Sequence, residues 1–178
     1  HASVVGVRPI LPSITEVGQG LGCMGINAKE EIMGLDKCLV NPNHPMMAII
    51  GGAKISSKLP IIKALIKSLD YLAIMGAMAH TFLVSKGIPV GKSHCEGSVE
   101  LQDLAREIIR ECETSKVHLL LPTDFILADE ETAVIKIPPE GEVQDIGPLT
   151  VSEVIAAMKE CKTIFFNGPV GRWEKQPY

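Results

Sequence analysis

The sequence of 178 residues lacks several features that would place it in other classes of protein. No apolar run reaches the roughly 20 residues of a membrane-spanning helix, and no charged stretch followed by a long apolar one marks a secretion signal. Basic residues are not in excess either: 17 lysines and arginines stand against 21 aspartates and glutamates, for a net charge of −4. The sequence therefore argues against both a membrane and a nucleic acid as the main partner.

The five cysteines also lack the spacing of a disulfide framework or of a zinc site. They are Cys23, Cys38, Cys95, Cys112 and Cys161, and no two of them form a CxxC pair. Widely spaced cysteines in odd number are typical of reduced thiols, so we expect a cytoplasmic protein without disulfides.

The most informative segment is MAIIGGAKISSK at residues 47–58. Its apolar run predicts a buried strand that ends at Gly51 and Gly52, where a sharp turn and a close approach by a ligand are possible. Lys54 and Lys58 follow at the start of a helix, where they repel each other and oppose the helix dipole. An anion bound between them, and to the free N–H groups of the helix start, removes both costs. The segment predicts a phosphate site, although two solvated lysines would give the same pattern.

Apolar strands alternate with amphipathic helices along the rest of the chain. We expect parallel strands at residues 46–51, 71–75, 117–121 and 163–166, and a short pair of strands at 125–128 and 133–137. We expect helices at residues 59–69, 77–85, 99–112 and 151–160, with Ser56 or Ser57, Ser98 and Thr150 as N-caps. This order predicts an α/β fold, a Rossmann-like parallel sheet with helices on both faces.

Three glycine-containing turns follow strands of this predicted sheet. Gly51-Gly52, Gly76 and Asn167-Gly168 stand where three strands end, and ligands bind parallel sheets at the carboxyl ends of their strands.

The first 45 residues differ from the rest of the chain in composition and pattern. Residues 1–26 are glycine-rich and are interpreted as the tail of a preceding domain, residues 27–45 as a connecting helix with Asn27 as N-cap and a linker, and residues 46–178 as the α/β domain.

Six motifs in order resemble those of the phosphoglycerate kinase family along nearly the whole chain. They are AIIGGAKISSK at 48–58, MAHTFL at 78–83 with GKS at 91–93, LPTDF at 121–125, AD at 128–129, DIGP at 145–148, and NGPVG at 167–171 with Glu174. The residues HAS at 1–3 and VG at 5–6 resemble the end of the family's N-terminal substrate domain.

The resemblance implies a kinase of glycolysis and gluconeogenesis that moves a phosphoryl group between 1,3-bisphosphoglycerate and ADP. This chain would carry mainly the ATP/ADP-binding half, and residues 1–26 would end the domain that binds 3-phosphoglycerate. Neither the basic residues for the acid substrate nor the loop whose aspartate serves Mg2+ is found in it. We therefore expect an α/β domain truncated at the C-terminus, no metal ligand within the chain, no activity of the chain alone, and the remainder of the same polypeptide as a partner.

The resemblance also implies roles for individual residues. Gly51, Gly52, Ala53 and Gly76 would line the nucleotide, as would Asn167, Gly168 and Pro169. Lys54 would hold the nucleotide phosphates, Lys58 would be the catalytic residue that meets the transferring phosphoryl group, and Glu174 would accept the ribose hydroxyls.

The sequence departs from the family's pattern around the nucleotide base. Ala77 replaces a glycine and leaves less room, His94 stands where an apolar residue is usual, and residues 142–144 (EVQ) replace a stretch with tryptophan and glycine. Arg172 and Trp173 replace a smaller apolar residue and a phenylalanine. The phosphate end is intact, so these changes concern the choice of nucleotide.

Two alternative functions stay open on the sequence alone. A Rossmann-type oxidoreductase is one, although the sequence lacks its G-x-G-x-x-G motif. A non-catalytic nucleotide-binding relative is the other, and the altered base slot favours it. His80 lies in the predicted helix 77–85 and is interpreted as a partly buried structural histidine rather than a catalytic one.

Overall fold

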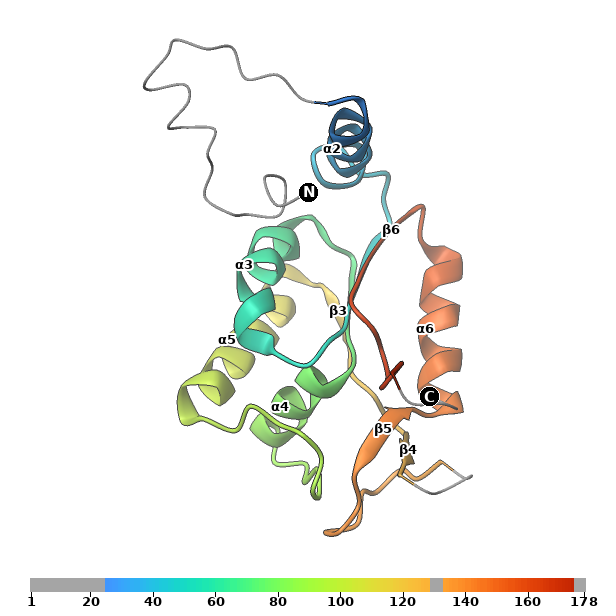
Figure 1. Ribbon diagram of the computed structural model, residues 1–178. Coiled ribbons are helices and arrows are strands. Elements are labelled where there is room, and N and C mark those ends of the chain that lie inside the picture. The colour runs from blue at the N-terminus through green and yellow to red at the C-terminus, as the bar shows by residue number, and fades with distance from the viewer. Residues whose placement is uncertain (1–24, 129–132, 175–178) are drawn as a thin grey trace. The chain divides into compact units, whose positions relative to one another are not determined.

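The computed structural model describes residues 25–128 and 133–174, and the chain divides into two units, His1–Asn41 and Pro42–Tyr178 (Figure 1). The described part of the first unit is the helix α2 (Ile26–Leu39), which confirms the expected helix but begins after Gly25. Asn27 lies inside this helix and is not its N-cap. The rest of the expected tail, residues 1–24, lies outside the described residues.

The second unit is built on a four-stranded parallel sheet in the order β3-β2-β1-β6. Its strands are β1 (Met46–Ile50), β2 (Tyr71–Ile74), β3 (His118–Leu120) and β6 (Thr163–Asn167), which confirms the four predicted parallel strands. Every residue of the inner strand β1 is buried. Ile50 is in register with Ile74 and with Asn167, so three strands end together at one edge of the sheet.

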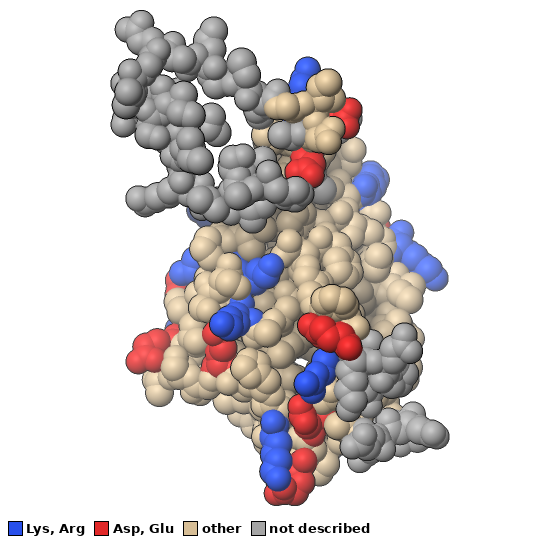
Figure 2. Space-filling model, in the orientation of Figure 1, with Lys and Arg blue, Asp and Glu red and all other residues tan. Residues whose placement is uncertain are grey.

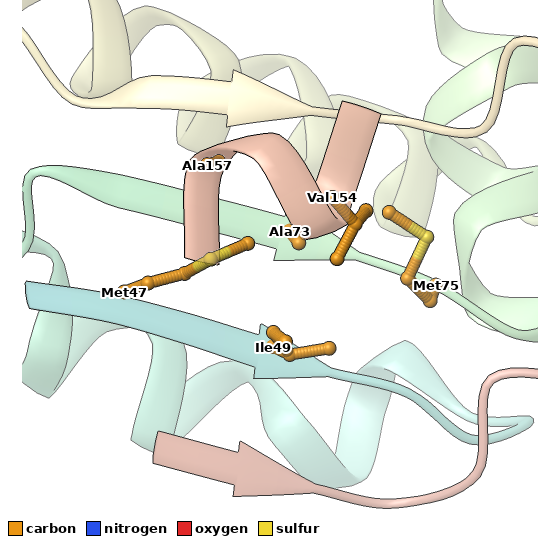
Figure 3. Packing of buried hydrophobic residues seen from close by; sticks show 6 residues of the cluster. All are labelled: Met47, Ile49, Ala73, Met75, Val154 and Ala157. Carbon is orange, nitrogen blue, oxygen red and sulfur yellow. The ribbon is translucent and has the colours of Figure 1, made fainter. Parts of the chain in front are cut away.

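Helices cover both faces of this sheet, as predicted. In Figure 1, α3 (Ile55–Leu65), α4 (Ala77–Ser85) and α5 (Val99–Ser115) lie on one side of the sheet and α6 (Pro148–Glu160) on the other. Figure 3 shows the packing beneath α6, where Val154 and Ala157 meet Met47, Ile49, Ala73 and Met75 of the strands β1 and β2 and the turn after β2. Burial of this apolar surface holds the strand ends in place.

Helix α3 begins four residues earlier than predicted, at Ile55, and a short 3₁₀ turn (Ile66–Ser68) follows it. Neither Ser56 nor Ser57 is its N-cap; Lys54 holds that position without a side-chain hydrogen bond. Pro60 lies in the second turn of the helix rather than in the first turn, where proline is most common. As a result, Lys58 belongs to the helix.

The short pair of strands has a different partner from the one predicted. Strand β4 (Phe125–Leu127) pairs antiparallel with β5 (Val143–Ile146), whereas residues 133–137 contribute only a bridge from Val134 to Phe125. The sequence does not predict β5, because Gln144 and Asp145 interrupt its apolar pattern.

Helix α6 is capped by an aspartate from a distant segment, not by Thr150 as predicted. The carboxylate of Asp124, which is 1% exposed, accepts hydrogen bonds from the Leu149 N–H (2.9 Å), the Thr150 N–H (2.8 Å) and the Thr150 hydroxyl (2.6 Å). Burial raises the pKa of Asp124, but these hydrogen bonds outweigh it and hold the pKa below its ordinary value. Asp124 therefore satisfies the first N–H groups of α6 in ionised form.

We expect Asp124→Asn to lower the free energy of unfolding by about 1–3 kcal/mol near neutral pH, because an amide cannot accept all three hydrogen bonds. A carboxylate whose pKa is lower in the folded chain stabilises it above the unfolded pKa, and this contribution is lost as the pH falls through the folded pKa. The parent should therefore unfold at a higher temperature than the variant at neutral pH, and the two unfolding temperatures should become similar in acid. Asp103→Asn is the control, because Asp103 is 64% exposed in a surface pair with Arg106. Equal losses in the two variants would contradict the capping role.

The three cysteines whose side chains are described, Cys95, Cys112 and Cys161, are free thiols, as expected. Burial raises the pKa of Cys112 to about 11. In the described ranges, none of the helices has the length and apolar character needed to cross a bilayer. Outside its grey parts, the face shown in Figure 2 carries acidic and basic side chains interspersed, with no broad field of one sign.

Candidate functional site

Three turns meet in backbone contact at the carboxyl edge of the sheet. The N–H of Gly51, after β1, donates to the Asn167 carbonyl of β6 (2.8 Å), and a Cβ on Gly51 would lie 2.1 Å from the Pro169 carbonyl oxygen. A Cβ on Gly76, after β2, would lie 2.8 Å from the Gly52 nitrogen, and Gly76 has a φ of +67°. No side chain fits at these points, so the glycines bring the three turns together.

Gly52 differs from these glycines because space is open beside it. Its φ is +115°, and the nearest atom to a Cβ there would be Cε of Lys58, 3.9 Å away. Its carbonyl accepts from the Met78 N–H of α4 (2.9 Å). Gly52 thus gives a smooth backbone surface that a ligand can approach.

The structure brings Lys58 and Asn167 together from opposite ends of this unit. The Lys58 ammonium, on α3, donates a hydrogen bond to Oδ1 of Asn167 at the end of β6. Lys54 lies exposed at the N-cap of α3, and its ammonium has no partner among residues 25–128 and 133–174. One lysine is held by an amide and the other is available to an anion.

The start of α3 already attracts an acidic group. The N–H and the hydroxyl of Ser56 donate to the Glu96 carboxylate (3.3 and 3.2 Å). The sequence predicted free N–H groups here, and one of them is occupied. A carboxylate at this position is favoured by the helix dipole, as a phosphate would be.

A cavity of about 370 Å³ lies beside the three turns. Among the predicted site residues, those that line it are Gly52, Ala53, Gly76, Pro169 and Glu174. The others, Gly51, Lys54, Lys58, Asn167 and Gly168, are not part of its wall. Gly51 and Gly168 support the wall through their backbone, because a Cβ on Gly168 would lie 2.4 Å from the Gly51 carbonyl oxygen.

The residues that depart from the family's pattern form much of the remaining wall. They are Ala77, His94, Glu142, Val143, Gln144 and Arg172; Trp173 is 68% exposed and is not in the wall. Seven further residues line the cavity and were not predicted as site residues: His80, Pro122, Phe125, Asp145, Ile146, Val170 and Gly171. All seven lie in quoted motifs (MAHTFL, LPTDF, DIGP and NGPVG), but no local pattern placed β4 and β5 at this edge of the sheet.

His80 is 4% exposed within α4, which confirms a buried helix histidine. Its Nδ1 contacts the His94 carbonyl oxygen (2.7 Å), and burial lowers its pKa. A neutral imidazole therefore forms part of the wall. Burial also raises the pKa of Asp145, whose carboxylate accepts from the Ile146 N–H (2.8 Å).

Three polar side chains, those of Glu142, Gln144 and Arg172, line one part of the cavity. Nη1 of Arg172 donates to Oε1 of Gln144 (3.1 Å) and to Oε1 of Glu142 (3.3 Å), and the Arg172 N–H donates to the Gln144 carbonyl (2.8 Å). Gln144 is 4% exposed, while the side chains of Glu142 and Arg172 are 48% and 53% exposed.

Within the described ranges, no three histidine, cysteine or carboxylate side chains gather into a metal site. The arrangement offers a glycine surface, two lysines and a largely apolar cavity, which suits a flat group with phosphates attached.

Comparison with known proteins identifies one family. The family model described as phosphoglycerate kinase matches residues 1–178. The phosphoglycerate kinase of Ruegeria pomeroyi is 37% identical over 186 residues, which include 100% of this chain and 44% of that protein. The phosphoglycerate kinase of Desulfosudis oleivorans is 42% identical over 162 residues, 86% of this chain and 40% of that protein.

Solved structures show the same fold. The phosphoglycerate kinase of Coxiella burnetii matches with a TM-score of 0.79 and 33% identity, over 86% of this chain and 41% of that one. The enzyme of Pyrococcus horikoshii matches with a TM-score of 0.70 and 21% identity, a likeness of fold alone. The chain spans less than half the length of these relatives.

Proposed function

The chain belongs to the phosphoglycerate kinase family, and we propose that it forms the nucleotide-binding half of an enzyme that transfers a phosphoryl group between 1,3-bisphosphoglycerate and ADP. The observation that carries the proposal is the pairing of Lys58 with Asn167 beside the glycine turns of three strands. Phosphoryl transfer needs positioning and charge neutralisation more than it needs a covalent catalyst, and this edge of the sheet supplies both.

In this proposal the glycine turns receive the nucleotide. Gly52, Gly76 and Pro169 form the surface beneath it, and Glu174 accepts from the ribose hydroxyls. Lys54, which lacks a partner among the described residues, binds the nucleotide phosphates, and Gly51 and Gly168 keep the surface free of side chains.

Lys58 is the proposed catalytic residue. In the forward step, the bond between phosphorus and the acyl oxygen breaks, and phosphorus bonds to a terminal oxygen of ADP, so that a carboxylate leaves and ATP forms. No proton is transferred between the two substrates, so no general base is required. The Lys58 ammonium neutralises charge on the transferring group, and Asn167 acts as a positioning residue that holds the ammonium through its amide oxygen.

The nucleotide enters as its magnesium complex, and the carboxylate ligand of that ion is expected in the remainder of the polypeptide. The remainder is also proposed to bind 3-phosphoglycerate in a domain that ends with residues 1–26. Residues 27–45 would connect that domain to the nucleotide-binding domain, residues 46–178. We also propose that the protein is located in the cytoplasm.

The test is a coupled phosphoryl-transfer assay on the natural full-length protein and on the 178-residue chain by itself. We expect turnover of 1,3-bisphosphoglycerate with a magnesium nucleotide by the full-length protein and none by the chain alone. A full-length protein that binds nucleotide without turnover would instead establish a non-catalytic relative. Turnover by the chain alone would contradict a site divided between two parts of the polypeptide.

A further inference from the structure

His80 carries an unpaired hydrogen-bond acceptor. Its Nδ1 lies 2.7 Å from the His94 carbonyl oxygen, which can only accept, so Nδ1 bears the proton of the neutral ring. The other ring nitrogen, Nε2, is therefore an acceptor, and it has no hydrogen-bond partner among residues 25–128 and 133–174. A donor on a bound molecule would give it one.

This nitrogen is open to the cavity rather than enclosed in the core. In the described part of the chain, the unpaired side-chain nitrogen or oxygen that is fully enclosed is Nε2 of Gln144. Nε2 of His80 is unpaired as well but is not enclosed in this way, so it keeps exposed surface. Because His80 lines the cavity and is only 4% exposed, that surface faces the cavity. A ligand atom in the cavity can therefore reach it.

The cavity leads from an exposed rim to this acceptor. Glu174, the predicted contact of the ribose, is exposed, whereas His80 lies one turn of α4 beyond Gly76 and is buried. Lys54 and Lys58 lie outside the wall, so phosphates bound to them leave the cavity to the ribose and the base. A base attached to a ribose at Glu174 would turn its far end toward the buried part of the cavity, where His80 lies.

The surroundings of His80 hold its ring in the accepting form. Burial lowers the pKa of His80, so the ring is neutral near pH 7, and the hydrogen bond to the His94 carbonyl fixes its tautomer and orientation. Phe125, which is 3% exposed, and Ile146 add apolar surface to the wall, against which a flat base can lie. The acceptor is thus oriented before a ligand binds.

We propose that His80 selects an adenine nucleotide, with Nε2 accepting a hydrogen bond from the 6-amino group of the base. The inference rests on the proposed function, since it names the residue that reads the base of the nucleotide held by Lys54 and Lys58. The 6-amino group lies at the end of adenine far from the ribose and donates, whereas guanine and hypoxanthine carry an acceptor, O6, at the same position. Two acceptors that face each other in a buried site both stay unpaired, which costs free energy.

The test is calorimetric titration of the natural full-length protein with four nucleoside diphosphates in the presence of magnesium. ADP carries the 6-amino group, purine riboside diphosphate has only hydrogen there, and GDP and IDP carry O6. IDP lacks the 2-amino group of GDP, so any effect of that group is separated from the effect of O6. We expect ADP to bind about tenfold more tightly than each of the other three, as for a buried polar group that loses its partner.

A histidine outside the wall provides the control. His80→Phe keeps a ring but removes the acceptor, so ADP should bind only as tightly as purine riboside diphosphate does. His118→Phe makes the same change on β3, where His118 stacks on Tyr71 with ring centroids 5.1 Å apart, and it should leave the preference for ADP intact.

A second readout needs no variant. In the parent protein with ¹⁵N-labelled histidines, the resonance of the unprotonated Nε2 of His80 should shift when ADP binds, because the nitrogen gains a hydrogen bond. It should stay in place when purine riboside diphosphate binds.

Equal affinity of the parent protein for ADP and purine riboside diphosphate would overturn the role of His80. So would IDP that binds as tightly as ADP, because the donor would then be N1–H and not the 6-amino group. If binding still depended on Lys54 and Lys58, the proposed function would stand in either case. Failure of all four nucleotides to bind would overturn both proposals.

Discussion

Replacing Lys54 and Lys58 together by alanine is expected to abolish detectable nucleotide binding while the fold stays intact. Each charge-assisted contact with a phosphate contributes about 1.5–3 kcal/mol, so the loss of two lowers affinity by roughly a hundredfold or more. The free chain should be no less stable, because two like charges at the start of α3 are removed. Calorimetry with ADP and GDP measures the affinity, and thermal unfolding the stability.

The same helical region provides a control. Lys63 and Lys67 have the same spacing of four residues, and Lys63 pairs with Glu107 away from the cavity. The double variant Lys63→Ala and Lys67→Ala changes the net charge equally and should bind both nucleotides like the parent. Binding that survives the loss of Lys54 and Lys58, or that is lost equally in the control, would show that the phosphates bind elsewhere.

In the single variant Lys58→Ala, we expect the turnover number to fall by about a hundredfold to a thousandfold, as for a lost donor at a transition state.

Gly51→Ala is expected to have the second large effect, on both stability and binding. The new Cβ would lie 2.1 Å from the Pro169 carbonyl oxygen, so the turns after β1 and β6 must separate. Overpacking of this kind typically costs about 1–3 kcal/mol. Because Gly52 and Pro169 both line the cavity, the separation should also weaken nucleotide binding about tenfold, by roughly the same free energy.

Gly97→Ala is the matched control, since a Cβ there meets nothing within 4 Å. It should lower neither the unfolding temperature nor the affinity. If Gly51→Ala proved equally harmless, the close contact between the two turns would not be a requirement of the site.

The parallel sheet was predictable because its signals are local. Apolar runs such as residues 46–50 end at glycines, and amphipathic helices separate them, so strand positions and the glycine turns follow from the chain order. Because parallel strands end at the same edge of a sheet, the turns that follow them also lie close together in space. The pairing of Lys58 with Asn167 is a consequence of this topology that no local pattern states.

The parts that were missed depend on contacts between distant segments. Asp124 caps α6 across 26 positions from Thr150, so the local sequence suggested the wrong cap. Strand β5 has two adjacent polar residues, Gln144 and Asp145, at its centre, and the Gln144 side chain accepts a hydrogen bond from Arg172. Its departure from the family's pattern was visible in the sequence, whereas its fixed amide orientation required the structure.

The central claim is that the edge formed by the turns after β1, β2 and β6 holds the phosphates of a nucleotide. The most direct measurement is a crystal structure of the natural full-length protein with a magnesium nucleoside diphosphate. We predict phosphate oxygens within hydrogen-bonding distance of the ammonium groups of Lys54 and Lys58, with the ribose at Glu174. A nucleotide whose phosphates lie away from both lysines, with Lys58 still bound to Asn167 and Gly52 uncovered, would contradict this account.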